Sequence, residues 1–220
     1  PKDTSRPYPI MLARSPYSSG PYGKDRMKRK LGPSMLFTEA GFIFVYQDVR
    51  GKYLSEGDFV PVRPHIPNKK GKEFDESSDT YDTIEWLLAN VPNNNGRVGT
   101  WGISAPGFYT THTAIEAHPA LKAASPQAPV TDWWLGDDRH HNGALMYQAS
   151  FSFVPSYGAV RPEPSTRGTR GFRGYNSQDG YRWYLDLGPV TTLNEKYLHH
   201  KNPLWNDLME HEDYDAWWQA

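Results

Sequence analysis

The sequence has no cysteine, no long apolar run and almost no net charge. Without cysteine there is no disulfide framework, no thiolate nucleophile and no zinc–thiolate site. The absence of cysteine does not determine the cellular compartment. Residues 41–45 are typical of the longest apolar runs, which fall far short of the roughly 20 residues needed to span a membrane. A net charge of −1 creates no overall field that would draw the chain to nucleic acid or anionic lipid. We therefore expect neither a membrane nor nucleic acid as a partner.

Apolar residues are scarce as well, at 37% of the 220 residues, whereas aromatic residues reach 14% and include eight tryptophans. Disordered chains are poor in aromatic residues, so the composition favours a folded chain. A length of 220 residues corresponds to one large or two modest domains, at about 100–200 residues per domain. The chain starts at Pro1 without a signal-like segment, so we expect that a leader was removed or that the beginning is missing.

The first 126 residues alternate between strand-like and helix-like patterns. Apolar and β-branched runs predict strands over 9–13, 41–46, 97–103 and 121–125, with a long polar loop over 49–78. Helices are predicted to start near Ser77 or Ser78 and at Pro106. The first helix carries an apolar stripe that consists of Tyr81, Ile84, Leu87 and Leu88 with Trp86 beside it. Strands separated by helices imply crossover connections and a parallel sheet with both faces covered.

The character of the chain changes after residue 126. Six of the eight tryptophans lie there, β-branched runs are few, and arginines cluster between residues 161 and 173. This composition predicts helices and loops that pack through aromatic side chains. We therefore divide the chain into an α/β part over residues 1–126 and a separate helical subdomain over residues 127–220.

The sharpest motif is WGISAPG at residues 101–107. A serine between a strand and a helix, flanked by small residues, has the geometry of a nucleophile elbow, whose strained turn lifts the hydroxyl out of the sheet. Gly102 allows the backbone to approach closely, and a helix N-terminus favours developing negative charge. The strict G-x-S-x-G pattern fails, because Pro106 stands where its last glycine belongs and Gly107 follows. A serine in a tight structural turn is the alternative, but the predicted strand and helix favour Ser104 as a nucleophile.

Four segments resemble the serine hydrolase family that includes cocaine esterase, X-Pro dipeptidyl peptidases and α-amino-acid ester hydrolases. GISAPGFY at residues 102–109 is similar to the family's G-x-S-Y-x-G segment, and RSPY at 14–17 to its R-x-P-Y loop. QDVRG at 47–51 with SEG at 55–57 is similar to Q-D-x-R-G-x-x-x-S-x-G, and GDD at 136–138 to the G-D-D region of the ester hydrolases. The match covers most of residues 10–145. It implies a partial α/β-hydrolase domain, a mostly parallel sheet with flanking helices, followed by a helical, aromatic-rich cap.

The resemblance assigns roles to three residues. Ser104 would attack an acyl carbonyl after losing its proton to a histidine and would form an acyl-enzyme. The backbone N–H of Ala105 and the hydroxyl of Tyr17 would hold the oxyanion. For Tyr17 the alternative is an aromatic wedge in a proline-containing turn. For Asp48 and Arg50 we favour bracing of a loop by a local ion pair.

The resemblance also implies a substrate. In α-amino-acid ester hydrolases a cluster of carboxylates receives the α-ammonium group, and Asp138 matches one of its members. The alternative is a helix-capping or solvated aspartate, a role that Asp137 could equally fill. Ala105 departs from the family, which has tyrosine directly after the nucleophile. The backbone donor survives this change and the side chain lining the acyl pocket is lost, so we expect a roomier acyl site and altered preference between acyl acceptors.

The aspartate and histidine of a catalytic triad are expected outside this chain. In an α/β-hydrolase each follows a later strand, in the order Ser…Asp/Glu…His. Residues 126–220 show no convincing strand, and the histidines at 140–141, 199–200 and 211 lie in aromatic, loop-rich or helical surroundings. We therefore expect a fragment that is inactive alone, with the remaining sheet strands and a C-terminal jelly-roll domain beyond residue 220.

Other sites are less favoured by the sequence. Adjacent histidines such as those at 199–200 point in different directions and no H-E-x-x-H is present, so we expect no metal and no cofactor. The basic run at residues 24–30 has no interleaved aromatics and predicts a solvated helix face. The arginine-rich stretch at 161–182 is better explained by cap packing or a subunit interface than by nucleic-acid binding.

The resemblance therefore implies hydrolysis of α-amino-acid esters and amides, with acyl transfer to amines such as β-lactam nuclei. One alternative is an ester or X-Pro peptide hydrolase of the same family without ammonium recognition. Another is a non-catalytic binding domain that kept the fold. The resemblance further implies a homo-oligomer, a tetramer in the ester hydrolases, and a periplasmic or secreted location.

Overall fold

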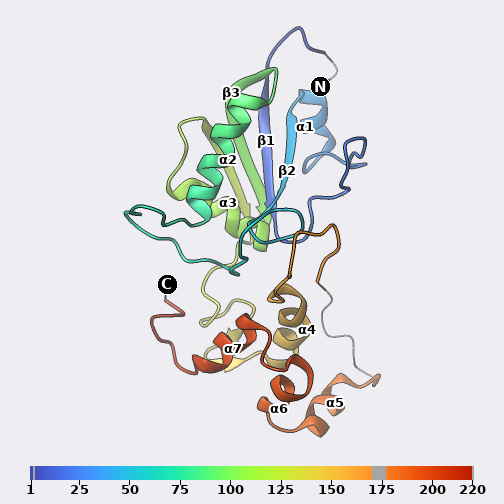
Figure 1. The fold of residues 1–220 in the computed structure, drawn as a ribbon, viewed down its shortest axis with the longest axis vertical. Helices are drawn as coiled ribbons and strands as arrows, with labels where there is room; N and C mark the ends of the chain where they lie inside the picture. The colour runs from blue at the N-terminus through green and yellow to red at the C-terminus, as the bar shows by residue number, and fades with distance from the viewer. Residues whose placement is uncertain (2, 170–176, 220) are drawn as a thin grey trace. The chain divides into compact units, whose positions relative to one another are not determined.

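The computed structural model describes residues 1, 3–169 and 177–219, and Figure 1 shows its fold. The chain forms two compact units. The N-terminal unit comprises Pro1–Asp58, Val62–Val130 and Pro164–Thr166, and the C-terminal unit comprises Phe59–Pro61, Thr131–Glu163 and Arg167–Ala220. Within the described ranges no helix has the length and apolar character needed to cross a membrane.

A four-stranded parallel sheet forms the centre of the N-terminal unit. Its strands are β1 (Tyr8–Ser15), β2 (Ile43–Asp48), β3 (Asn94–Ile103) and β4 (Leu121–Gln127), in the order β2-β1-β3-β4. The predicted α/β class with a mostly parallel sheet is confirmed. Strand β3 begins three residues earlier than predicted, because Asn94 pairs with Tyr8 across an irregularity in the register of β1. The Asn-Gly pair at residues 95–96, a sequence typical of turns, therefore lies in the first part of this strand.

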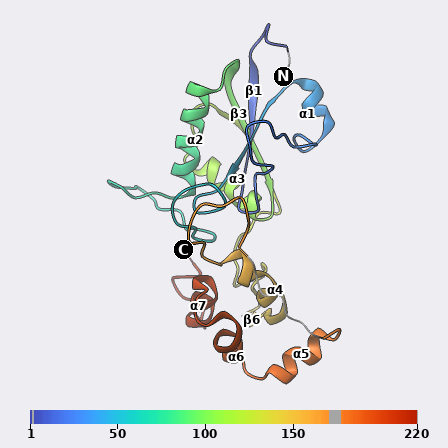
Figure 2. The same cartoon turned by 45° about the vertical axis from the view of Figure 1, so that its right-hand side comes forward.

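Three helices connect these strands. Helix α1 (Met35–Ala40) joins β1 to β2, α2 (Glu76–Asn90) joins β2 to β3, and α3 (Ala105–Ile115) joins β3 to β4. In the sheet, β2 lies on one side of β1, whereas β3 and β4 lie on the other side. Because crossovers between parallel strands are right-handed, α1 lies on one side of the sheet, with all its residues exposed, and α2 and α3 lie on the other side. Figure 2 shows α1 and α2 on opposite sides of the strands.

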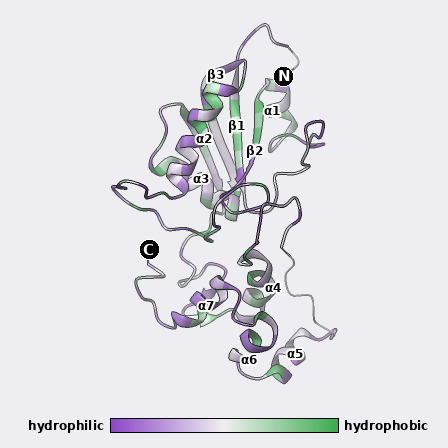
Figure 3. Cartoon of the chain, viewed as in Figure 1, coloured by the Kyte–Doolittle hydropathy of each residue, from purple (hydrophilic) through white to green (hydrophobic). Residues whose placement is uncertain are grey.

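The hydrophobic core of this unit lies between the central strands and α2. Its buried members are Ile10 and Leu12 on β1, Val98 on β3, Ile84 and Leu87 on α2, and Ala120 before β4. Figure 3 shows the hydrophobic colour along β1 and β2. The prediction of a sheet with both faces covered does not hold fully for β2, which is half-buried over residues 43–47 because it is the last strand on its side of the described sheet.

Helix α2 differs from the prediction at its start and along its stripe. Asp75 caps it, not Ser77 or Ser78, because the Asp75 carboxylate accepts the Ser78 N–H at 3.0 Å while the Ser78 side chain accepts the Asp75 N–H at 2.9 Å. This reciprocal capping box satisfies two backbone donors. Of the predicted stripe, Tyr81 stays 38% exposed, and Trp86 beside it is 62% exposed.

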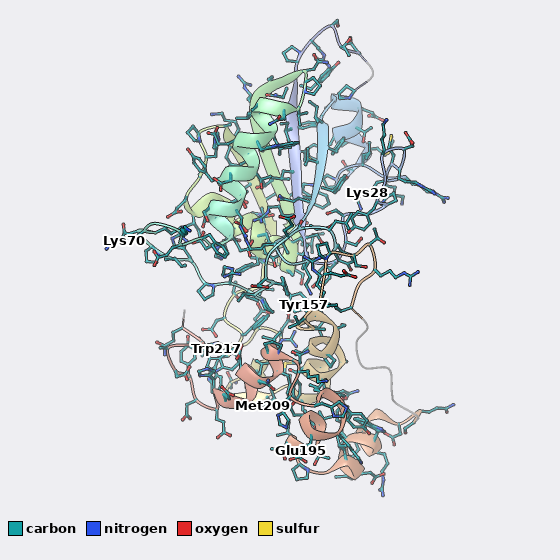
Figure 4. All side chains as sticks on the ribbon, viewed as in Figure 1. Lys28, Lys70, Tyr157, Glu195, Met209 and Trp217 are labelled. Carbon is teal, nitrogen blue, oxygen red and sulfur yellow. The ribbon has the colours of Figure 1, made fainter. Side chains whose placement is uncertain are left out.

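The basic run at residues 24–30 is not a helix, so that prediction is wrong. It forms turns and irregular structure, since glycine and proline flank it at residues 20–23 and 32–33. Lys28 (labelled in Figure 4) donates to the Gly20 carbonyl at 2.6 Å, and its ammonium lies 4.9 Å from the centre of the Tyr46 ring. In the arginine-rich stretch at 161–182, residues 170–176 lie outside the described residues.

The C-terminal unit consists of short helices, loops and one small hairpin. Its elements are β5 (His140–His141), β6 (Ala144–Leu145), α4 (Tyr147–Tyr157), α5 (Gly180–Leu187), α6 (Thr191–Leu193), the π-helix η1 (Asn194–Leu198) and α7 (Pro203–Glu210). Phe151 and Trp205 are fully buried, with ring centroids 5.5 Å apart in an edge-to-face arrangement. Asn202 caps α7 through the Trp205 N–H and donates to the Val154 carbonyl, which ties α7 to α4. Helices and loops thus pack through aromatic side chains, as predicted.

Candidate active site

Ser104 stands at a sharp turn between β3 and α3. Its backbone has φ 63° and ψ −125°, a positive φ that is unfavourable for a residue with a side chain. Two backbone hydrogen bonds hold it there: its N–H donates to the Gln127 carbonyl at the end of β4, and its carbonyl accepts the Phe108 N–H, both at 3.0 Å. The residue is exposed, and its hydroxyl makes no hydrogen bond to any residue in the described part of the chain. A strained, exposed serine with an unengaged hydroxyl has the geometry of a nucleophile elbow.

Two glycines make this turn possible. A Cβ on Gly102 would overlap the carbonyl group of Pro106, so the strand can approach the first turn of α3 only with glycine at this position. A Cβ on Gly107 would lie 2.8 Å from the Gln127 carbonyl oxygen, because α3 crosses closely over the end of β4. Gly107 therefore serves close packing, although it stands one position later than the strict motif demands. Helix α3 begins at Ala105, one residue before the predicted start.

The first turn of α3 presents unpaired backbone donors beside Ser104. The first N–H groups of a helix have no acceptor within the helix, and Ala105 is the first residue of α3. Ala105 itself is buried, at 4% exposure. The aligned peptide dipoles of the helix add partial positive charge at this end. This end of α3 is therefore suited to a negative charge that develops next to Ser104.

Tyr17 follows the neighbouring strand. In the parallel register of β1 and β3, Leu12 lies opposite Thr100, so the carboxyl ends of both strands meet at one edge of the sheet. The loop after β1 carries Tyr17, and the turn after β3 carries Ser104. This point between β1 and β3 is also where the direction of the chain across the sheet reverses, and open α/β sheets bind ligands there. Tyr17 is 45% exposed, so its ring is not a buried wedge.

Asp48 and Arg50 do brace loops, but not through an ion pair with each other. The Asp48 carboxylate accepts the Ser19 N–H at 2.6 Å and the Tyr22 hydroxyl at 2.7 Å. Arg50 instead forms a bidentate ion pair with Asp79 on α2, in which Arg50 Nε lies 2.8 Å from Asp79 Oδ2. The predicted local pair is wrong, because α2 brings a better-placed carboxylate to Arg50.

A buried ion pair lies at the end of β1. Arg14 contacts the carboxylate of Glu76 at 3.2 Å, and each side chain is only 3% exposed. Arg14 also donates to Gln47 on β2 at 2.9 Å and to Thr80 on α2 at 2.5 Å. Burial raises the pKa of Glu76 more strongly than Arg14 lowers it. Neither Glu76 nor this ion pair of Arg14 was predicted. The available signal was an arginine at the end of an apolar strand, because such a side chain needs a buried partner.

In the C-terminal unit the two neighbouring aspartates differ. Asp137 accepts the backbone N–H of Thr131 at 2.7 Å and so stabilises a turn, rather than capping a helix. Asp138 has a positive φ of 57° and a side chain that is 48% exposed, with Arg139 at 3.6 Å. The Arg139 side chain is buried over the Trp133 and Phe153 rings. Asp138 is thus the carboxylate of the pair that faces solvent.

Three histidines have structural contacts within their own units. His112 on α3 is 7% exposed and packs on the Phe108 ring at 4.2 Å, and burial lowers its pKa to about 4. His118 binds Glu85, and His211 binds Asp215. In the described ranges no histidine hydrogen-bonds to Ser104, and no group of three or more His, Asp or Glu side chains is arranged to hold a metal ion.

Comparison with known proteins identifies the family. The model of the X-Pro dipeptidyl-peptidase (S15) family matches residues 1–220. Cocaine esterase from Rhodococcus sp. (strain MB1 Bresler) is 26% identical over 228 residues, which cover 99% of this chain and 36% of that protein.

Two solved structures share the fold at higher identity. An α-amino acid ester hydrolase is 35% identical, with a TM-score of 0.82 over 100% of this chain and 35% of that one. An aminopeptidase from a marine sediment archaeon, Thaumarchaeota archaeon, is 35% identical, with a TM-score of 0.81 over 97% of this chain and 35% of that one. The chain spans about a third of the length of these relatives. By its sequence and its fold, the chain belongs to the X-Pro dipeptidyl-peptidase (S15) family.

Proposed function

We propose that the protein is a serine hydrolase in which Ser104 is the nucleophile. The observation that carries this proposal is the conformation of Ser104, an exposed hydroxyl on a positive-φ turn between β3 and α3. A protein maintains such strain at a position only where the surrounding structure holds it, and sites of this kind cluster in active sites. The four related motifs and the family membership support the same role.

The proposed reaction proceeds through an acyl-enzyme. The Ser104 oxygen attacks the carbonyl carbon of an ester or amide, and its proton passes to a histidine base. We assign the negative oxygen of the tetrahedral intermediate to the Ala105 N–H and the Tyr17 hydroxyl. The alcohol or amine then leaves with the proton, and water or an acceptor amine releases the acyl group. The base and its aspartate partner are proposed to lie outside the residues 1–220, as the family resemblance implies.

The proposed substrates are α-amino-acid esters and amides, with acyl transfer to amines, including β-lactam nuclei, as a further reaction. Two similar structures are named for an α-amino acid ester hydrolase and an aminopeptidase, and both names describe substrates with an amino group. We assign the α-ammonium group to Asp138, whose exposed carboxylate matches the family motif. A charge-assisted hydrogen bond to this group would fix the register of the substrate.

One observation favours the second candidate, an ester or X-Pro peptide hydrolase without ammonium recognition. Arg139 already lies 3.6 Å from the Asp138 carboxylate and partly neutralises it. Cocaine esterase, a relative over nearly the whole chain, is named for an ester substrate. The two candidates share the nucleophile and differ in the role of Asp138.

Labelling of the whole protein with a fluorophosphonate tests the nucleophile. We expect one labelled serine, located at Ser104 by peptide mass mapping, and no label in Ser104→Ala. Ser125→Ala, which removes an exposed serine from the neighbouring strand β4, is the matched control and should keep the label. A protein that folds but takes no label would instead be a binding domain on the same fold.

A substrate comparison tests the role of Asp138. We expect kcat/KM to be higher for an α-amino ester than for its des-amino analogue, and Asp138→Asn to reduce that ratio by about 10- to 100-fold, since a hydrogen bond to a charged group contributes about 1.5–3 kcal/mol. Asp137→Asn is the control, because Asn keeps an acceptor for the Thr131 N–H. Equal turnover of both esters, unaffected by Asp138→Asn, would favour the second candidate.

A further inference from the structure

The segments QDVRG at residues 47–51 and SEG at 55–57 have no role in the proposed mechanism, although both resemble parts of the family pattern. We infer that Asp48, in the first of these segments, is a positioning residue that holds the Tyr17 loop in the conformation needed to stabilise the oxyanion. This inference rests on the proposed function, in which Tyr17 is the side-chain donor. It concerns residues of the N-terminal unit alone.

Both oxygens of the Asp48 carboxylate are used by the Tyr17 loop. Oδ1 accepts the Ser19 N–H at 2.6 Å, and Oδ2 accepts the Tyr22 hydroxyl at 2.7 Å. Asp48 is 6% exposed, so these bonds form away from water and replace its hydration. Burial raises the pKa of Tyr22 to about 12, and Asp48 adds to that increase, so Tyr22 remains a proton donor throughout the physiological range.

The contacts fall on both sides of Tyr17. Before it, the Ser15 carbonyl accepts the Val49 N–H at 3.1 Å, which ties the start of the loop to the end of β2. The Ser15 hydroxyl oxygen also accepts the N–H of Tyr17 at 3.0 Å. After it, Ser19 is bound to Asp48. The backbone of Tyr17 is therefore held within two residues on either side, and its exposed ring is carried by a fixed loop.

A second layer holds Asp48 itself. Asp48 is the last residue of β2, and it lies opposite Ser15 in the parallel register. The Ser55 hydroxyl donates to the Asp48 carbonyl at 2.5 Å, because the loop of residues 49–57 folds back onto the end of the strand. Within the same loop, the Tyr53 hydroxyl donates to the Tyr17 carbonyl at 3.1 Å. The two otherwise unassigned segments thus form one support under the Tyr17 loop.

A support of this kind affects catalysis through geometry. Oxyanion stabilisation requires a donor at hydrogen-bond distance from the place where the charge develops, and a displacement of about 1 Å costs on the order of 100-fold in rate. Asp48 is not positioned to act as an acid or base, because both of its oxygens are engaged. A purely structural brace would lower stability and leave kcat unchanged, which separates the two explanations.

The test is a double-mutant cycle in the whole protein with a p-nitrophenyl ester as substrate. Tyr17→Phe should lower kcat by about 10²–10³-fold, the usual cost of losing one oxyanion donor. Asp48→Ala should lower kcat by about 10- to 100-fold with KM changed less than about threefold, because the loop is misplaced while binding remains. In the Tyr17→Phe background, Asp48→Ala should lower kcat by less than about threefold, since the group it positions is already gone.

Two further variants guard against a misfolded Asp48→Ala protein. Asp48→Asn keeps an acceptor for the Ser19 N–H and an amide that donates to the Tyr22 oxygen, so it should restore kcat to within about threefold of the parent. Tyr22→Phe removes one of the two contacts and should lower kcat about 3- to 10-fold, and this loss should also vanish in the Tyr17→Phe background. The matched control is Asp3→Ala, which removes the same pair of contacts, a Ser5 N–H and a Tyr8 hydroxyl, near the opposite end of β1. It should leave kcat unchanged.

The outcomes separate the two proposals. Full kcat in Tyr17→Phe would overturn the oxyanion role of Tyr17 and, with it, this inference. A large loss of kcat in Tyr17→Phe would support that role. The Asp48 inference would then fail if Asp48→Ala or Tyr22→Phe lowers kcat by the same factor in the Tyr17→Phe background as in the parent. It would also fail if both variants keep the parental kcat.

Discussion

Replacing Arg14 with leucine should destabilise the N-terminal unit in a pH-dependent way. Arg14 and Glu76 form an ion pair at 3.2 Å whose side chains are each 3% exposed. Leucine fills part of the space but leaves Glu76 buried without a guanidinium partner. Removing one partner of a buried pair costs about 3–5 kcal/mol, because the remaining charge is uncompensated.

The magnitude follows from the protonation of Glu76. Burial already raises its pKa above the ordinary value of 4.5, and loss of Arg14 raises it further. The folded variant then binds a proton that the unfolded chain has released. At about 1.4 kcal/mol for each pH unit above 4.5, a proton held on Glu76 costs at most about 3.4 kcal/mol at pH 7 and at most about 0.7 kcal/mol at pH 5. Because the folded state binds more protons, its stability falls as the pH rises above the ordinary pKa.

Urea unfolding, with hydrogen exchange of the β1 and α2 amides as a local readout, measures this loss. We expect the loss from Arg14→Leu to be larger at pH 7 than at pH 5, by at most about 2.7 kcal/mol, because the parent's Glu76, whose pKa is also raised, already accounts for part of this pH dependence. In the control, both proteins carry Glu76→Gln, and the loss from Arg14→Leu should then be the same at both pH values. An equal loss at pH 5 and pH 7 in the single variant would refute the argument that Glu76 is left as a buried, unpaired acid.

Three further changes have defined outcomes. Gly102→Ala should cost about 1–3 kcal/mol in urea unfolding and slow fluorophosphonate labelling, because its Cβ overlaps Pro106; unchanged labelling would contradict the close approach. Ala105→Tyr should narrow the acyl site and shift both acyl specificity and the ratio of hydrolysis to transfer, and that expectation fails if neither changes. Asn202→Ala should cost about 1–3 kcal/mol in the C-terminal unit, since it removes the α7 cap and a buried bond to Val154, and an unchanged urea midpoint would argue against that cap.

Much of the N-terminal unit could be predicted because its signals are local. Short apolar runs separated by helical stripes specify parallel strands and crossovers, and Ser104 was located by the small residues around it. The predicted boundaries of helices were less accurate where several side chains compete to cap the same helix. The start of α2 depends on whether Asp75 or a serine two or three residues later caps the helix, and only the pairing of Asp75 with Ser78 decides it.

Long-range partners were not predictable from the sequence. Arg50 was paired with Asp48, two residues away, but its partner Asp79 is brought near by α2. The role of Asp48 was likewise hidden, because Ser19 and Tyr22 approach it only when β1 and β2 lie side by side. Sequence spacing indicates neighbours within an element, whereas the Asp48 contacts depend on the register of two strands and the Arg50 contact depends on the packing of α2.

The central claim is that Ser104 is acylated during turnover, and acid quenching followed by mass spectrometry tests it most directly. The whole protein is mixed with an α-amino-acid ester, quenched within milliseconds and digested. We predict a peptide that contains Ser104 and carries the mass of the acyl group, present in the parent and absent from Ser104→Ala, which should also lose turnover. Turnover by Ser104→Ala at the parental rate, or an acyl group on another residue, would contradict the claim.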